Sequence, residues 1–179
     1  MLTIEVVTQD GYDEETEQFV AASVVVLELE HSLASLSKWE STFEKPFLNT
    51  FEKTPLEVMV YFMAMTLTPN VPSEVYKHLS NENIDEINNY INSKQNATTF
   101  SNLGEERSRE IITAEVIYYW MVAMQIPFEC QYWHLNKLLA LVRVINLKNA
   151  PKKKMSAAEI ASRNRELNSQ RRAALRSTG

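Results

Sequence analysis

The chain has 179 residues, of which 45 % are hydrophobic, with a formal net charge of −5, three glycines and one cysteine. This length and composition predict one domain with its own hydrophobic core, or one domain with an appendage. Three glycines effectively exclude phosphate-binding loops and nucleophile elbows, which need glycine where the backbone approaches a ligand, and one cysteine excludes an internal disulfide.

The first thirty residues predict an acidic β-ribbon. Residues 3–7 (TIEVV) and 23–30 (SVVVLELE) are rich in β-branched side chains and partly alternate, with the turn signal Asp10-Gly11 between them. The same thirty residues contain eight Asp and Glu and no Lys or Arg. Because two strands alone are marginal in water, we expect the ribbon to pack on the helices or on the sheet of another subunit.

Helical patterns begin at Ser32. The first predicted helix ends before Pro46 and has apolar residues at three- and four-residue steps, which are Leu33, Leu36, Trp39 and Phe43. The second begins with the capping box of residues 54–57 (TPLE) and runs to about Leu67. Because this second helix is apolar nearly all round, the pattern indicates a central position in the fold.

The middle of the chain predicts shorter helical pieces. Pro69 and Pro72 precede a short turn of helix near residues 75–79. The next predicted helix has Asn81 as its cap and an apolar face formed by Ile84, Ile87 and Ile91. Residues 93–104 are polar and predict a loop.

Two strongly apolar helices follow, over about residues 105–125 and 128–147, with a hinge at Ile126-Pro127. Both are apolar on more than one face, which in a protein in water indicates burial between neighbours. We therefore interpret the chain from residue 32 to residue 149 as one helical bundle.

The closing segment, residues 151–179, is basic, with eight Lys and Arg against two Glu. Ser156 and Glu159 form a predicted capping box, and Met155 can contact Ile160 as a hydrophobic staple, so a helix of about twenty residues is expected. The apolar face of this helix is thin. Because helices are stabilised mostly by packing of an apolar face, it is either marginal alone or docked on a partner.

The predicted fold class is therefore mainly α, a helical bundle with an N-terminal β-ribbon and a C-terminal basic helical arm. The predicted division is an acidic β-ribbon at 1–31, a helical core domain at 32–149 and a basic arm at 150–179.

Nothing in the sequence indicates an enzyme or a metal site. Cys130 and His134 are four residues apart and would share a helix face, but two ligands do not make a zinc site, and we expect both in the core. The Glu-x-x-His pairs of di-iron bundles are missing from the sequence. The longest uncharged apolar run, residues 116–128, has thirteen residues, and a bilayer needs roughly 20. We therefore expect a non-enzymatic protein of a reducing cytosol, without catalytic residues, cofactor, metal or transmembrane helix.

The basic tail has three interpretations: a solvated tail, a nucleic-acid binder, or an element that docks on an acidic protein surface. The capping signals argue against disorder. Residues 1–150, with 10 Lys and Arg against 21 Asp and Glu, would repel phosphates. We therefore expect head-to-tail self-association or docking on a different acidic subunit. The predicted partner-binding residues are Lys152, Lys153, Lys154, Arg163, Arg165, Arg171, Arg172 and Arg176, with Glu14, Glu15 and Glu17 as acceptors.

Six stretches resemble small proteins of the morphogenesis modules of tailed bacteriophages, and the resemblance covers nearly the whole chain. They are LELEHSLASLSKWES (27–41), MTLTPNVPSEVY (65–76), INSKQNATTFS (91–101), SREIITAEVIYYWM (108–121), IPFECQYWHLNKLLALVRV (126–144) and PKKKMSAAEIASRNRELNSQRRA (151–173). The family that this chain resembles is that of tail assembly chaperone-like proteins.

This resemblance implies a non-enzymatic protein in the cytoplasm of the infected bacterium. Tail assembly chaperones are thought to coat the tape measure protein and keep it soluble until tail tube subunits polymerise around it. Such a chaperone should expose apolar surface to a helical client. The alternative is a structural component retained in the virion, at the neck, tail or capsid, that docks through its basic arm. A regulator that binds nucleic acid is a third and weaker alternative.

Overall fold

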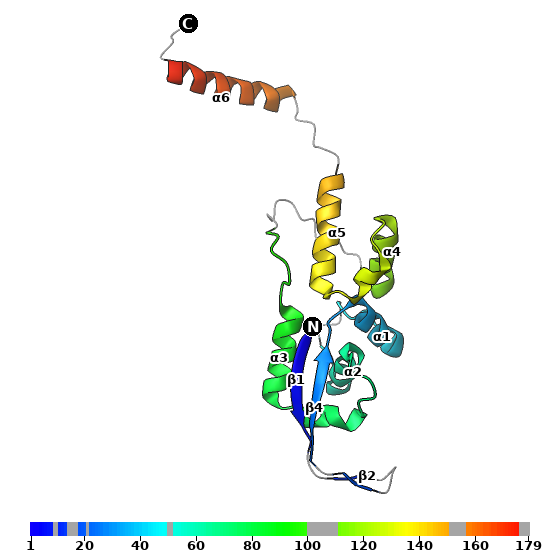
Figure 1. The fold of residues 1–179 in the computed structure, drawn as a ribbon. Coiled ribbons are helices and arrows are strands. Elements are labelled where there is room, and N and C mark those ends of the chain that lie inside the picture. The colour runs from blue at the N-terminus through cyan, green and yellow to red at the C-terminus, as the bar shows by residue number, and fades with distance from the viewer. Residues whose placement is uncertain are drawn as a thin grey trace. The chain divides into compact units, whose positions relative to one another are not determined.

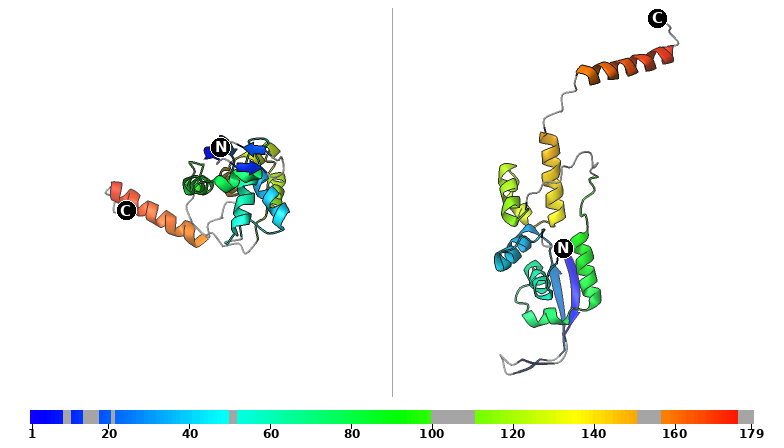
Figure 2. Two further views of the ribbon diagram at one scale, coloured as in Figure 1. Left: turned by 90° about the horizontal axis from the view of Figure 1, so that it is seen from below. Right: turned by 180° about the vertical axis from the view of Figure 1, so that it is seen from behind.

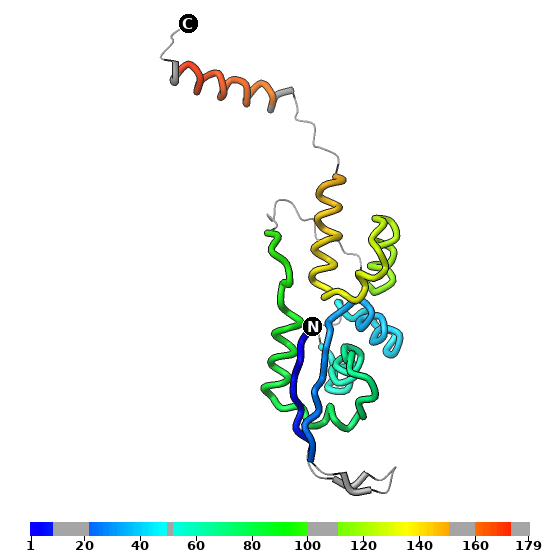
Figure 3. Tube along the Cα trace, viewed as in Figure 1, coloured from blue at the N-terminus to red at the C-terminus, as the bar shows by residue number. Residues whose placement is uncertain are grey.

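The computed structural model describes the backbone of residues 1–8, 11–13, 18–20, 22–49, 52–99, 111–150 and 157–175 (Figure 1). It describes the side chains of residues 1–8, 22–49, 52–99, 111–150 and 160–172 (Figure 3). The chain divides into two compact units, Met1–Ile145 and Asn146–Gly179. The protein is mostly helical with an antiparallel β-ribbon near its N-terminus, which confirms the predicted fold class (Figure 1).

The β-ribbon consists of β1 (Leu2–Val7) and β4 (Val24–Leu29), which pair antiparallel from Leu2 opposite Leu29 to Val7 opposite Val24. Alternate residues of both strands are buried, as a half-buried strand requires, and these are Ile4, Val6, Leu27 and Leu29. Both predicted strands are confirmed. The connection between them contains a second antiparallel pair, β2 (Gly11–Asp13) and β3 (Gln18–Val20).

Helices α1 (Leu33–Phe43) and α2 (Pro55–Met65) both begin with capping boxes. In the first, the Ser35 amide donates to Ser32 Oγ at 3.2 Å and the Ser32 amide donates to Ser35 Oγ at 3.0 Å. In the second, the Thr54 amide donates to Glu57 Oε2 at 2.8 Å and the Glu57 amide donates to Thr54 Oγ1 at 3.3 Å. The reciprocal bonds satisfy amides that have no partner inside the helix, and the predicted box at Thr54 is confirmed.

The apolar helix α2 is covered over most of its surface, as its composition predicts. Tyr61, Phe62 and Met65 are buried, and the half-buried Val58, Met59, Val60 and Met63 pack against the core. The exposed apolar residue of this helix is Leu56, in the first turn.

The predicted short turn of helix is present as η1 (Ser73–His78), a 3-10 helix, and α3 (Asn81–Asn92) follows it. The prediction that Asn81 caps this helix is wrong by one residue. Ser80 is the extended residue before the helix, and its Oγ accepts from the Asn83 amide at 3.1 Å. Asn81 is already helical and cannot act as the N-cap.

The two long apolar helices are shorter than predicted. α4 comprises Ala114–Ala123, and the described residues before it, 111–113, are not helical. Residues Phe128–Tyr132 form the 3-10 helix η2, and α5 (Leu135–Asn149) starts only after it. The reason is tertiary pairing, because the Leu135 amide donates to the His31 carbonyl at 2.7 Å and Ser32 and His134 form an isolated β-bridge.

The ribbon lies between helices of the first unit. α3 lies beside β1, and α2 lies on the side of β4 (Figure 1, Figure 2). The chain leaving α2 also pairs with β4: the Glu30 amide donates to the Met65 carbonyl at 2.9 Å, and the Leu67 amide donates to the Glu28 carbonyl at 2.7 Å. This pairing covers one edge of β4.

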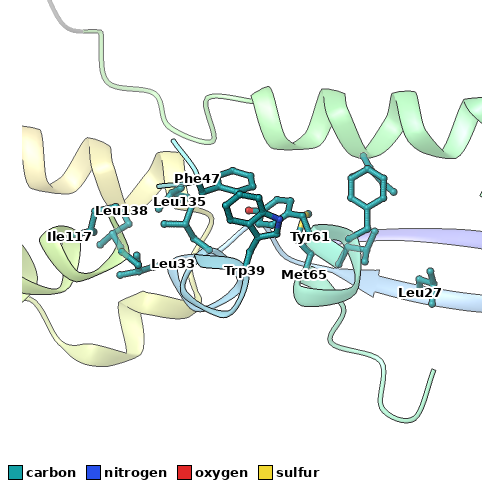
Figure 4. Packing of buried hydrophobic residues seen from close by; sticks show 14 of the residues in the cluster. Leu27, Leu33, Trp39, Phe47, Tyr61, Met65, Ile117, Leu135 and Leu138 are labelled. Atoms are coloured by element: carbon teal, nitrogen blue, oxygen red, sulfur yellow. The ribbon is translucent and has the colours of Figure 1, made fainter. Parts of the chain in front are cut away.

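One hydrophobic core joins the ribbon to the helices. Trp39, Phe47 and Tyr61 lie at its middle, with Leu27 and Met65 on the ribbon side (Figure 4). On the other side the core continues into the contacts of α1 with α4 and α5, through Leu33, Ile117, Leu135 and Leu138 (Figure 4). The ribbon is therefore stabilised by packing on the helices of its own chain.

The second unit contains α6 (Ala157–Leu175), a helix of 19 residues, in agreement with the length expected from the sequence. Its described side chains, residues 160–172, are exposed. The predicted cap Ser156 and staple residue Met155 lie outside the described residues.

Candidate contact surfaces

Buried and half-buried polar side chains link the ribbon to α3 and α5. The Tyr90 hydroxyl donates to Glu30 Oε1 at 2.6 Å, and Glu30 Oε2 pairs with the Met1 ammonium at 2.8 Å. His134 Nδ1 accepts from the Asn136 amide at 3.3 Å, so its proton lies on Nε2, which donates to the Tyr90 carbonyl at 3.1 Å. These bonds fix the tautomer and the orientation of the His134 ring.

His31 extends this polar contact into α2. Its ring centroid lies 5.1 Å from that of His134, and its Nδ1 forms a hydrogen bond of 2.5 Å with the Tyr61 hydroxyl. Burial and the neighbouring His134 lower the pKa of His31 to about 3, and burial also lowers the pKa of His134. With exposed fractions of 3 % and 5 %, both imidazoles are closed to solvent, and their bonds hold elements together.

Cys130 and His134 are both buried, as expected, but they do not share a helix face. Cys130 lies in η2, and His134 precedes α5. Within the described ranges, no three His, Cys, Asp or Glu side chains are grouped as a metal ion would require.

A buried carboxylate, Glu40, joins three parts of the first unit. From α1, its Oε1 accepts from the Phe47 amide and its Oε2 accepts from the Ala114 amide, each at 2.7 Å. Ala114 is the first residue of α4, so the carboxylate satisfies an amide at the positive end of that helix. This contact positions α4 and the surface that it carries.

That surface consists of Tyr118, Tyr119, Val122, Phe128 and Tyr132, and we call it the aromatic surface. Four of the five are well exposed, with fractions of 69 % for Tyr119, 62 % for Tyr132, 60 % for Val122 and 54 % for Phe128. Tyr118 joins α4 to η2, because its ring centroid lies 6.4 Å from that of Phe128 and its hydroxyl donates to Gln131 Oε1 at 2.9 Å.

Several observations make the aromatic surface one patch. Burial raises the pKa of Tyr118, and the neighbouring Tyr132 and Glu115 raise it further, which places both close to its hydroxyl. Val122 is four residues after Tyr118 and three after Tyr119, so it adjoins both on the helix surface. Scattered exposed apolar residues are ordinary, but a contiguous group rich in aromatic rings is typical of protein contact surfaces.

The side of the ribbon that faces away from the core forms a second surface, which we call the outer ribbon face. Its exposed residues are Thr3, Glu5, Val7, Val24, Val26 and Glu28. The strand register places Glu5 opposite Val26 and Val7 opposite Val24, so the apolar side chains are neighbours. Neither carboxylate forms an ion pair with another described residue. The face is therefore apolar and acidic together.

The described basic residues of the predicted partner-binding set, Arg163, Arg165, Arg171 and Arg172, all lie on α6 and are exposed. The others, Lys152, Lys153, Lys154, Arg176, Glu14, Glu15 and Glu17, lie outside the described residues.

Sequence reasoning missed the acidic residues Glu5 and Glu28 as contact candidates. The alternation of the strands contained the signal, because each lies between two residues that face the core. It also missed the aromatic surface, because α4 is apolar on every side and its pattern does not distinguish buried from open faces.

Comparison with protein-family models, with curated proteins and with solved structures finds no match to this chain. None of the helices in the described part of the chain combines the length and apolar character that a membrane crossing requires.

Proposed function

We propose that this protein is a non-enzymatic bacteriophage morphogenesis protein that binds the tape measure protein during tail assembly, as tail assembly chaperones do. Two things support the proposal: the resemblance of six stretches of the sequence to that family, and the aromatic surface. The aromatic surface is the observation that carries it, because a chaperone of this kind must present apolar groups to its client while it is itself folded.

The chemistry of the aromatic surface fits an apolar helical client. Tyrosine and phenylalanine offer large contact areas with few rotatable bonds, so little side-chain entropy is lost on binding. The apolar stripe of an amphipathic helix can lie across such rings, while the tyrosine hydroxyls accept or donate hydrogen bonds at the rim. Tyr118, half-buried and hydrogen-bonded to Gln131, supplies a fixed centre for this contact.

We expect the double substitution Tyr119→Ala and Phe128→Ala to weaken binding of the tape measure protein at least tenfold. Truncation of a central aromatic contact residue commonly costs about 2 kcal/mol or more. The measurement is co-purification from cells that express both proteins, followed by titration with a soluble tape measure fragment. Leu56→Ala is the matched control, because Leu56 is exposed to 58 % on α2, away from the aromatic surface.

Equal retention of the client by the double variant and by the control would contradict the proposal. Circular dichroism of both variants would show that the fold is intact, which we expect because both substituted side chains are exposed.

The alternative function is that of a structural component retained in the virion, and α6 favours it. A basic helix of 19 residues, whose described side chains at 160–172 are exposed, suits permanent docking on an acidic subunit. The two functions differ in one measurement, the protein content of purified virions. The chaperone function predicts that the protein is present in lysates of infected cells and missing from virions, whereas the structural function predicts stoichiometric copies in the particle.

A further inference from the structure

The outer ribbon face and α6 are complementary in charge and in apolar character. The ribbon face presents Glu5 and Glu28 beside three valines, and residues 1–30 contain no Lys or Arg to compensate them. α6 contains four arginines against two glutamates, Glu159 and Glu166. Opposite charges on surfaces of this kind promote association and select the partner.

The apolar groups of α6 lie on the same side of the helix as two of its arginines. Ile160 and Leu167 are exposed and seven residues apart, which is two turns. Arg163 follows Ile160 by three residues and Arg171 follows Leu167 by four, so all four side chains share one side of the helix, which we call the mixed side. Arg165 and Arg172 lie on the opposite side.

The dimensions of the two surfaces agree. The mixed side extends over eleven residue steps, or about 16 Å at 1.5 Å per residue. The six-residue strands of the ribbon extend over five steps, or about 17 Å at roughly 3.4 Å per residue. One helix laid along the ribbon can therefore place its two apolar residues on the valines and its two arginines near the carboxylates.

From this complementarity we infer that α6 of one copy of the protein docks on the outer ribbon face of a second copy. Ile160 and Leu167 cover Val24 and Val26, while Arg163 and Arg171 lie near Glu5 and Glu28. The contact is head to tail, so it leaves an unused ribbon face and an unused α6 at the ends of each dimer, and further copies add. This inference goes beyond the proposed function, because it concerns self-association without a client.

The association is weak and depends on salt. A single helix on a two-stranded ribbon buries less area than the roughly 1,200 Å² of stable complexes, so assembly occurs at high protein concentration. Exposed ion pairs contribute little individually and are screened by salt, so the valines supply most of the attraction and the charges supply orientation. Pairing with the ribbon also supplies the apolar contact that α6 needs to be a stable helix.

The test is sedimentation of the purified full-length protein over a range of concentrations. We expect concentration-dependent oligomers for the natural chain, and association weakened at least tenfold in the variant Glu5→Lys/Glu28→Lys and in the variant Arg163→Glu/Arg171→Glu. An equimolar mixture of these two variants should associate again, because the intact α6 of the first meets the intact outer ribbon face of the second.

Two matched controls keep the charge change and alter its position. Arg165→Glu/Arg172→Glu changes the opposite side of α6, and Glu115→Lys/Glu129→Lys changes exposed carboxylates of α4 and η2. Both should associate as the natural chain does. The inference is overturned if the natural chain is monomeric at all concentrations, as docking of α6 on its own chain would produce. It is also overturned if the controls lose association equally, or if the mixture of the two variants stays monomeric. Because no tape measure protein is present, failure here leaves the client-binding test unaffected.

Discussion

Replacing Glu40 by alanine is expected to lower the free energy of unfolding by about 3 to 5 kcal/mol. The substitution removes the acceptor of two short hydrogen bonds, from the Phe47 and Ala114 amides, and leaves both buried amides without that partner. An unsatisfied buried amide costs about 1 to 3 kcal/mol, and loss of the carboxylate at the start of α4 adds to this.

Urea unfolding followed by circular dichroism would measure the change at Glu40. Glu40→Gln should fall between the natural chain and Glu40→Ala, because one side-chain oxygen still accepts while the amide nitrogen faces a second donor. Glu52→Ala is the control, since Glu52 is exposed, and it should change stability by less than about 0.5 kcal/mol. A loss for Glu40→Ala no larger than that of Glu52→Ala would show that the carboxylate does not hold α4.

Acidification from pH 8 to pH 5 is expected to lower the free energy of unfolding by about 2 kcal/mol through His31 alone. The pKa of His31 is 6.5 in the unfolded chain and about 3 in the fold. Below pH 6.5 the unfolded state therefore binds a proton that the folded state does not bind. The contribution of neutral His31 to the free energy of unfolding is fully present above pH 6.5 and is lost as the pH decreases toward 3. The lowered pKa of His134 acts in the same direction.

The pH range separates this effect from that of carboxylates. Glu57, whose pKa a hydrogen bond from Lys45 lowers to about 2, contributes stability that is lost only as the pH falls below about 4.5. The melting temperature should fall less between pH 8 and pH 5 for His31→Asn than for the natural chain. The control His78→Asn, which replaces an exposed histidine, should lose as much as the natural chain. Parallel declines in all three proteins would refute the role of His31.

The elements that could be predicted from sequence are those whose causes are local. The strands 3–7 and 23–30 and the capping box at Thr54 depend on side chains a few residues apart, and the structure confirms them. The starts of α4 and α5 depend instead on Glu40 and His31, which lie in distant parts of the chain. No pattern within residues 105–147 contains that information, so both helices were expected too long.

The contact surfaces show the same difference between local and distant causes. The basic character of α6 is visible in composition, and its length of 19 residues agrees with the helix expected from the sequence. The aromatic surface consists of the side chains of α4 and η2 that the core does not cover. Which side of α4 is covered depends on the packing of α1 against α4. The sequence therefore predicted the basic tail as a contact element and did not predict the exposed aromatic residues of α4 and η2.

The bond between His31 and Leu135 has a consequence for synthesis on the ribosome. The β1–β4 ribbon, α1 and α2 emerge first. The backbone amides of Ala114 and Leu135, which bind the Glu40 carboxylate and the His31 carbonyl, are translated tens of residues later. Contacts so distant in sequence form slowly, because the entropic cost of closing a long loop comes before the favourable energy of the contact. The nascent chain thus carries the uncovered face of α1 until α4 and η2 leave the exit tunnel, a period in which two neighbouring nascent chains are at risk of pairing wrongly.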